Sequence, residues 1–145
     1  MLVTVLVATM LLAAVFDLRE RRIPNWLTGT GFAFVVALRA LEQPFPLPLK
    51  EGLLGAAMLA VPFFLVWLVN REAIGMGDVK LLAAVGMALG PRLGPDALMA
   101  AGAAFVLWLA GRLAVGHRLE WRASVPMAPF LAAGVVVVAA IGTGV

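Results

Sequence analysis

The sequence predicts an all-α membrane protein that crosses the bilayer several times. Apolar residues make up 63% of its 145 residues and charged residues only 13%, and the mean hydropathy is +1.05. That composition leaves too little polar surface to cover a soluble globule of this length. The basic residues form no run or stripe, so the net charge of +3 does not indicate nucleic-acid binding. We expect a lipid bilayer around the chain and no nucleic-acid partner.

Six apolar segments are candidate transmembrane helices, because crossing the hydrocarbon takes about 20 helical residues, or somewhat fewer where flanking side chains reach the interface. Their predicted bounds are 2–16, 26–41, 53–69, 79–89, 97–115 and 125–141. The fourth is short, and we expect it to extend through 75–90 or to lie partly inside the protein. We treat residues 1–145 as one membrane domain. The first segment lacks a basic start and an evident cleavage site, which favours a membrane helix over a cleaved signal peptide.

The distribution of lysine and arginine predicts the orientation, since basic residues are retained on the cytoplasmic side during insertion. Connections after the first, third and fifth segments hold eight basic residues: Arg19, Arg21, Arg22, Arg71, Lys80, Arg112, Arg118 and Arg122. The other connections hold three, namely Arg39, Lys50 and Arg92. Both termini are therefore predicted to lie outside, with the proline-rich stretch 44–48 in an outer loop.

Two of the three aspartates border apolar segments on the predicted cytoplasmic side. Asp17 ends the first segment, where the helix dipole and apolar neighbours disfavour a charge, whereas Asp78 lies at a helix start, which favours one. We expect Asp17 to be mainly protonated and Asp78 mainly ionised. Such a split pair can hydrolyse a peptide through an activated water. The third aspartate, Asp96, is predicted to cap the fifth segment on the outer side.

Other catalytic groups are scarce. The chain has no cysteine and a single histidine, His117, so a cysteine nucleophile and a histidine-rich metal site are both excluded. Gly75 and Gly77 flank Asp78 and would allow positive φ or a close backbone approach at this point. We predict a site that needs neither a metal nor a cofactor.

Three stretches of the sequence resemble the type IV prepilin peptidase family of membrane aspartyl proteases. They are Asp17 with the following Ile23-Pro24-Asn25, then Gly75-Met76-Gly77-Asp78-Val79-Lys80-Leu81, and the late Val125-Pro126-Met127-Ala128-Pro129-Phe130. The resemblance spans nearly the whole chain. It implies that Asp17 and Asp78 are the catalytic pair and that they remove the basic leader of prepilin-like precursors at the cytoplasmic face of the inner membrane.

Within that resemblance, Gly75, Gly77, Pro24 and Asn25 are expected to shape the site. Lys80 is a possible substrate contact, although a side chain reaching the membrane interface is the simpler prediction. Larger relatives also carry a cytoplasmic region with paired cysteines and methylate the new N-terminus. The compact chain resembles instead the stand-alone peptidases of Tad-type pilus systems and, less closely, archaeal preflagellin peptidases, so we expect cleavage without methylation. The sequence predicts no oligomeric state.

Four alternatives remain open from the sequence. Presenilin-like proteases share the Gly-x-Gly-Asp signature, but their Pro-Ala-Leu motif is missing here. A proton-coupled transporter or scaffold would also place carboxylates in the membrane, although a relay needs ionisable groups across its whole depth. Asp78 could be only a helix cap, and Asp17 only a solvated interfacial charge paired with Arg21.

Overall fold

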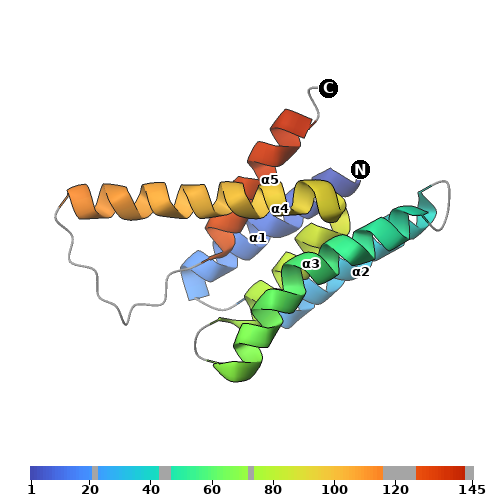
Figure 1. The fold of residues 1–145 in the computed structure, drawn as a ribbon, viewed down its shortest axis with the longest axis horizontal. Coiled ribbons are helices and arrows are strands. Elements are labelled where there is room, and N and C mark those ends of the chain that lie inside the picture. Colours follow the sequence, from blue (N-terminus) through green and yellow to red (C-terminus); the bar gives the residue numbers. More distant parts are fainter. Residues whose placement is uncertain (21–22, 43–46, 72–73, 116–126, 143–145) are drawn as a thin grey trace.

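Five helices account for most of the chain that the structure describes. This computed structural model covers residues 1–20, 23–42, 47–71, 74–115 and 127–142. In Figure 1 the helices are α1 (Leu2–Glu20), α2 (Asn25–Leu41), α3 (Leu47–Val69), α4 (Met76–Ala114) and α5 (Ala128–Gly142). No strand occurs in these ranges, which confirms the all-α prediction. Several residues used above lie outside them: Arg21, Arg22, Pro44, Phe45, Pro46, His117, Arg118, Arg122, Val125 and Pro126.

The fourth and fifth predicted segments are the two halves of α4, which is why six apolar segments appear as five helices. The halves meet at Gly90, whose φ of 72° and ψ of −174° lie outside the helical region. Glycine adopts this conformation readily, whereas residues with a Cβ atom are strained in it. The second half resumes at Pro91, a residue well suited to a first helical position. Asp96 is therefore inside the helix, and its predicted capping role is wrong.

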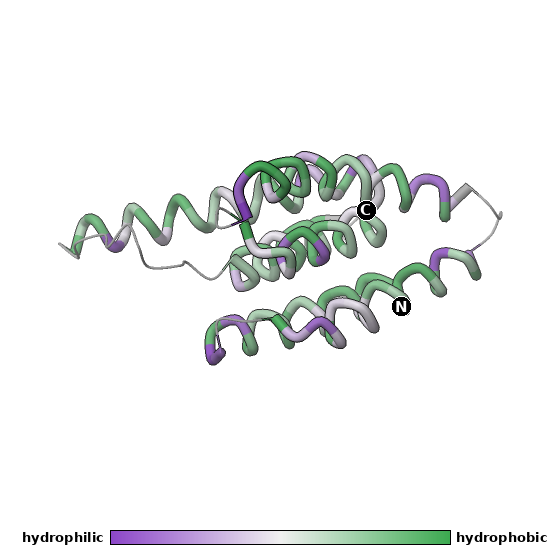
Figure 2. Tube along the Cα trace, turned by 90° about the horizontal axis from the view of Figure 1, so that it is seen from below, coloured by the Kyte–Doolittle hydropathy of each residue, from purple (hydrophilic) through white to green (hydrophobic). Residues whose placement is uncertain are grey.

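Three helices, α1, α3 and α4, are long and apolar enough to cross a membrane by length and composition, and α5 is a shorter apolar helix. Apolar residues occupy most of the length of the helices (Figure 2). The start of α3 differs from the prediction. It begins at Leu47 instead of Leu53, because Pro48 falls in the first turn, where the missing N–H of proline costs nothing.

The first half of α4 forms the centre of the bundle. Val79, Leu81, Leu82 and every residue of 84–90 are buried, and α4 contacts each of the other four helices. This confirms the expectation that the short fourth segment extends beyond its apolar core and lies inside the protein. Its burial fixes the position of Asp78, which lies in its first turn.

Glycines allow α3 and α4 to cross at backbone contact. A Cβ added to Gly86 would lie 2.7 Å from the amide nitrogen of Ala56 and closer still to the carbonyl of Gly55. A methyl group on Gly55 or on Gly86 would therefore overlap the backbone of the opposite helix. Small residues at such crossings allow the van der Waals contact that holds helices together in lipid.

We expect Gly86→Ala to lower the free energy of unfolding by about 1–3 kcal/mol, the usual cost of overpacking. The matched control is Gly102→Ala, because nothing lies within 4 Å of a Cβ at that position. Unfolding in detergent micelles, followed by tryptophan fluorescence, would measure both. Equal stabilities of the two variants would show that α3 and α4 do not depend on this contact.

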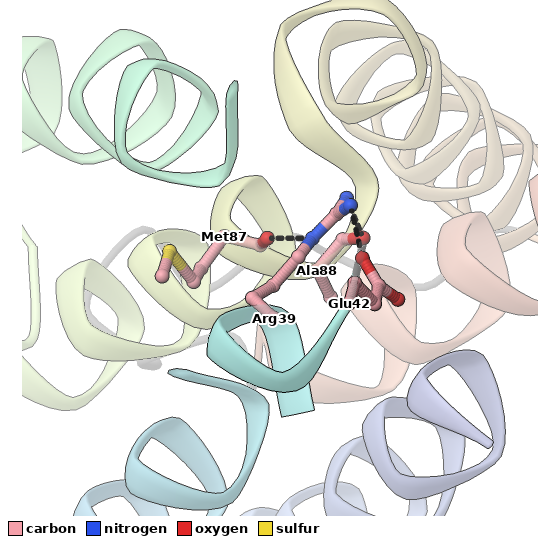
Figure 3. Close-up of polar contacts among 4 residues, drawn as sticks. All are labelled: Arg39, Glu42, Met87 and Ala88. Carbon is pink, nitrogen blue, oxygen red and sulfur yellow. Dashed lines mark hydrogen bonds and ion pairs between the residues drawn. The ribbon is translucent and has the colours of Figure 1, made fainter. Parts of the chain in front are cut away.

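Arg39, near the end of α2, stabilises the break in α4. In a regular helix the carbonyl of Met87 would accept from residue 91, but Pro91 has no N–H, and the turn at Gly90 also interrupts the next bond. Arg39 Nε donates to the Met87 carbonyl at 3.1 Å, and Nη2 donates to the Ala88 carbonyl at 2.7 Å (Figure 3). A cation also suits the negative end of a helix dipole.

Glu42 completes this arrangement. Its carboxylate accepts from Arg39 Nη1 at 2.9 Å, and the arginine side chain is only 15% exposed. The guanidinium therefore has three partners, two of them carbonyls that the broken helix cannot satisfy itself (Figure 3). Arg39 binds the end of α2 to the end of the first half of α4.

Arg39→Met should destabilise the protein by about 1–3 kcal/mol, because two carbonyls at the break lose their donors. Arg92→Met removes an exposed cation from the same end of the molecule and should change stability little. The same unfolding measurement applies. If Arg39→Met and Arg92→Met unfolded alike, the carbonyls at the break would have other partners.

Candidate active site

Asp17 lies on the buried face of α1. That face is an apolar stripe at helical spacing, formed by Leu2, Leu6, Met10, Ala13 and Ala14, and Asp17 continues it one turn further. The residue is only 8% exposed, which excludes the alternative that Asp17 is only a solvated charge at the interface. Its Oδ2 accepts a hydrogen bond from the backbone N–H of Ala128 at 3.1 Å. The carboxyl group at the end of α1 therefore meets the start of α5.

Asp78 is the third helical residue of α4. Gly75 is the N-cap, and its carbonyl accepts from the N–H of Asp78 at 3.0 Å. The carboxylate of Asp78 in turn accepts from the backbone of Gly75. The bond from the third helical residue back to the N-cap is one half of a capping box, and the other half is absent because glycine has no side chain. The alternative that Asp78 is only the N-cap of this helix is therefore wrong, because Gly75 is the N-cap. Asp78 nevertheless stabilises the helix start.

The two carboxyl groups are close enough to interact electrostatically. Asp17 comes from the end of α1 and Asp78 from the start of α4, and both side chains are at least half-buried. The fold therefore brings together two acids that are far apart in the sequence. Like charges held in a partly buried site cannot both ionise freely, which is the condition for dividing the roles of acid and base between them.

The flanking glycines serve close approach and not unusual backbone angles. Gly75 has a φ of −71°, so the positive φ considered for it is wrong. A Cβ there would lie 3.1 Å from Asp78 Oδ2, and a Cβ on Gly77 would lie 3.3 Å from the Cβ of Ile23. A side chain at either position would crowd the carboxylate or the segment that joins α1 to α2.

Pro24 and Asn25 position the start of α2 against α4. Pro24 is the N-cap of α2, and its carbonyl accepts from the N–H groups of Leu27 and Thr28. The Oδ1 atom of Asn25 accepts a hydrogen bond from Lys80 Nζ at 2.8 Å. The ammonium group of Lys80 is therefore held at the start of α2 instead of extending freely to the interface. This contact joins the two sequence motifs directly.

The environment of Asp17 is the main feature that the sequence did not predict. Its position at the end of α1 was expected to disfavour a charge, but the N-terminal end of α5, with its free amides, lies against it. The stretch 125–130 carries part of the family resemblance, but nothing in its sequence predicts a contact with Asp17. Which carboxyl group holds a proton therefore stays a prediction.

A pocket of about 260 Å³ lies between α2 and α4 beside this site. It is lined by Thr28, Gly29, Phe32, Lys80 and Ala83. Since Asn25 and Lys80 are hydrogen-bonded, the pocket begins where the two motifs meet. It has no counterpart in the predictions from sequence, because its walls come from two helices that are not adjacent in the chain.

Other chemistries find little support in the described residues. No group of three or more histidine, cysteine, aspartate or glutamate side chains is placed to hold a metal ion there. Nor do the helices offer a proton relay. Between Asp17, Asp78 and Lys80 at one end and Arg39 at the other, α1, α2 and the first half of α4 contain no ionisable residue. The transporter alternative would need such residues across the depth of the membrane.

Comparison with known proteins yields one consistent result. A model of the type IV leader peptidase family matches residues 4–142. The chain is 33% identical over 104 residues to the type 4 prepilin-like proteins leader peptide-processing enzyme of Escherichia coli, covering 68% of this chain and 38% of that protein. It is 30% identical over 133 residues to the prepilin leader peptidase/N-methyltransferase of Bacillus subtilis, covering 90% and 51%.

A third relative is the prepilin leader peptidase/N-methyltransferase of Xanthomonas campestris, at 36% identity over 75 residues, or 48% of this chain and 25% of that protein. The chain spans about half the length of these relatives or less. No solved structure matches the chain significantly. The family match nonetheless includes both Asp17 and Asp78, and since it covers almost the whole chain, this membrane protein belongs to the type IV leader peptidase family.

Proposed function

We propose that this protein is an aspartic endopeptidase that removes the basic leader from prepilin-like precursors at the cytoplasmic face of the inner membrane. The observation that carries the proposal is that Asp17, at the end of α1, and Asp78, at the start of α4, are both largely buried and interact electrostatically. Family membership and the activities named for its relatives support the same reaction. The precursor has a basic leader on the cytoplasmic side and an apolar segment in the membrane. Its cleavage site would therefore lie at the membrane interface, where helix ends such as those of Asp17 and Asp78 are expected to lie.

The reaction needs only water and the two carboxyl groups. One ionised carboxylate accepts a proton from water as its oxygen attacks the carbonyl carbon of the scissile peptide. The other, protonated, carboxyl group donates its proton, and the tetrahedral intermediate collapses as the C–N bond breaks and the leaving amine is protonated. Partial burial supports this division of roles. Gly75, Gly77, Pro24 and Asn25 shape the site, and cleavage without methylation stays a prediction.

We expect Asp17→Asn and Asp78→Asn each to lower the cleavage rate at least about a hundredfold, the usual minimum contribution of general acid–base catalysis. The assay uses membranes that contain equal amounts of each variant and a pilin-like precursor, and the new N-terminus of the product is sequenced. Asp96→Asn, an exposed position inside the second half of α4, is the control and should retain full activity. Wild-type rates from either of the first two variants would refute the two-aspartate mechanism.

A second experiment separates two roles for Lys80. If Lys80 only holds α2 in place through Asn25, then Lys80→Met and Asn25→Ala should lower kcat/KM by similar factors, and the double variant should lose no more than either. If Lys80 also binds the precursor, Lys80→Met should cost clearly more than Asn25→Ala, mainly through KM. Full activity in all three variants would mean that the contact matters to neither positioning nor binding.

A further inference from the structure

Two helices of this chain end in closely similar sequences. Residues 64–71, around the end of α3, read Phe-Leu-Val-Trp-Leu-Val-Asn-Arg, and residues 105–112, in the last turns of α4, read Phe-Val-Leu-Trp-Leu-Ala-Gly-Arg. Steps of three and four residues put the phenylalanine, the tryptophan and the arginine of each sequence on one face of a helix. We name these sets the Trp67 motif, of Phe64, Trp67 and Arg71, and the Trp108 motif, of Phe105, Trp108 and Arg112.

The structure gives the two motifs the same geometry. In the Trp67 motif the two rings stack with centroids 5.7 Å apart and planes 19° apart, and in the Trp108 motif the values are 6.1 Å and 25°. The guanidinium carbon of Arg71 lies 5.0 Å from the centre of its tryptophan ring, and that of Arg112 lies 5.1 Å from the other. Both distances are typical of a cation–π contact. Each arginine is therefore held over a ring without the help of a carboxylate.

The Trp67 motif lies at the end of the bundle that carries Asp78. α3 ends at Val69 and α4 begins at Met76, so only a short connection separates Arg71 from the first turn of α4, which contains Asp78. The distribution of basic residues predicts that this connection is cytoplasmic. Arg71 and Asp78 therefore belong to the same end of the bundle.

The Trp108 motif lies at that end as well. The rings of Phe105 and Trp108 pack against the ring of Phe130, with centroids 5.3 and 5.6 Å apart. Phe130 is in the first turn of α5, and Ala128 in the same turn donates its N–H to Asp17, which interacts electrostatically with the aspartate of α4. Both helices therefore reach the aspartates' end of the bundle with an arginine held over a tryptophan.

The surroundings of Arg71 and Arg112 are those of a membrane interface. Both arginines are exposed, and within the described ranges neither forms an ion pair with a carboxylate. Tryptophan is enriched where helices leave the hydrocarbon, and arginine near a helix end extends towards the headgroups. The anion nearest to such a cation is a lipid phosphate. Exposed apolar side chains surround both motifs: Leu65, Val66, Leu68, Val69, Val106, Leu107 and Leu113.

We infer that Arg71 and Arg112 bind the phosphate groups of anionic lipids in the cytoplasmic leaflet, and that the two motifs thereby fix the depth of this end of the bundle in the membrane. A guanidinium donates two parallel hydrogen bonds to a phosphate, and the ring beside it restricts the side chain before the lipid binds. Anionic lipids are favoured because their negative surface potential attracts basic side chains. Interfacial tryptophan and arginine anchors also set how a helix lies in the bilayer. The inference goes beyond the proposed function, since lipid binding needs no precursor.

The first test titrates a short-chain phosphatidylglycerol into the protein in neutral detergent micelles and follows the unfolding temperature, which a ligand of the folded protein raises. Arg71→Met and Arg112→Met should each need about fivefold more lipid for the same rise, the factor expected of one basic residue at an anionic surface. The double variant should need about twenty-five-fold more. Arg92→Met, which removes an exposed arginine beside the break in α4, is the control and should respond like the wild type. A double variant with a wild-type response would refute the inference.

Further probes identify what the arginines bind. Inorganic phosphate and a short-chain phosphatidylcholine, at the same concentrations, should each raise the unfolding temperature much less than phosphatidylglycerol. An equal effect of inorganic phosphate would show a site for free anions and overturn the assignment to lipid. A double variant that loses self-association in micelles, with an unchanged lipid response, would show that the arginines contact a second copy of the chain instead.

The second test measures depth in the bilayer. The chain has no cysteine, so Val69→Cys, at an exposed position at the end of α3, supplies a single thiol for a water-soluble maleimide. In inverted membrane vesicles, adding Arg71→Met should slow labelling several-fold, because the apolar end of α3 sinks into the hydrocarbon without its anchor. Adding Arg92→Met instead should leave the rate unchanged. The same labelling in detergent micelles corrects for the loss of a charge near the thiol.

An unchanged labelling rate in the Arg71→Met vesicles, after that correction, would refute the anchoring role. Both tests stand apart from the proposed reaction, because neither uses a precursor, so a failure to cleave would leave their results intact. Should the double variant not fold in micelles, the two single variants and the labelling rates decide.

Discussion

The break in α4 and its stabilisation by Arg39 underlie the rest of the structure. In lipid every backbone polar group needs a partner within the protein, and a helix interrupted by Gly90 and Pro91 leaves carbonyls without one. Arg39 supplies these partners and thereby joins α2 to the first half of α4. The glycine contact with α3 holds the same half from another side. A short, buried helix fixed at its far end can present Asp78 at a defined place.

The candidate site is built from helix ends. The end of α1 contributes Asp17, the start of α4 contributes Asp78, the start of α2 contributes Asn25, and the start of α5 provides the amide of Ala128. Free amides and carbonyls are concentrated at such ends, so polar chemistry can be assembled at the edge of an otherwise apolar bundle. The apolar middle of the helices contributes packing, and Thr28, Gly29, Phe32, Lys80 and Ala83 line a pocket between α2 and α4.

Several expectations about individual residues changed because contacts across the bundle outweigh local sequence. The charge state of Asp17 was predicted from its place at the end of α1, yet its carboxyl group accepts a hydrogen bond from Ala128 at the start of α5. Gly75 was considered for a positive φ, yet the residue that uses one is Gly90, where α4 breaks. Lys80 was expected to extend to the membrane interface, yet its ammonium group donates to Asn25, while a contact with the substrate stays a prediction. Each of these depends on which segments become neighbours, a property that helical spacing along one segment does not contain.

The sequence by itself determined the class of the protein. Its apolar content indicated membrane-spanning helices, because a helix satisfies its own backbone hydrogen bonds in lipid. The stretches around Asp17 and Asp78 indicated the family and the candidate catalytic pair. Tertiary structure alone decided that two apolar segments form one broken helix, that Arg39 donates to the free carbonyls of Met87 and Ala88, and that the two aspartates lie within electrostatic range of each other. The physical reason is distance along the chain: composition and periodicity act locally, whereas these contacts join residues tens of positions apart, and only packing selects them.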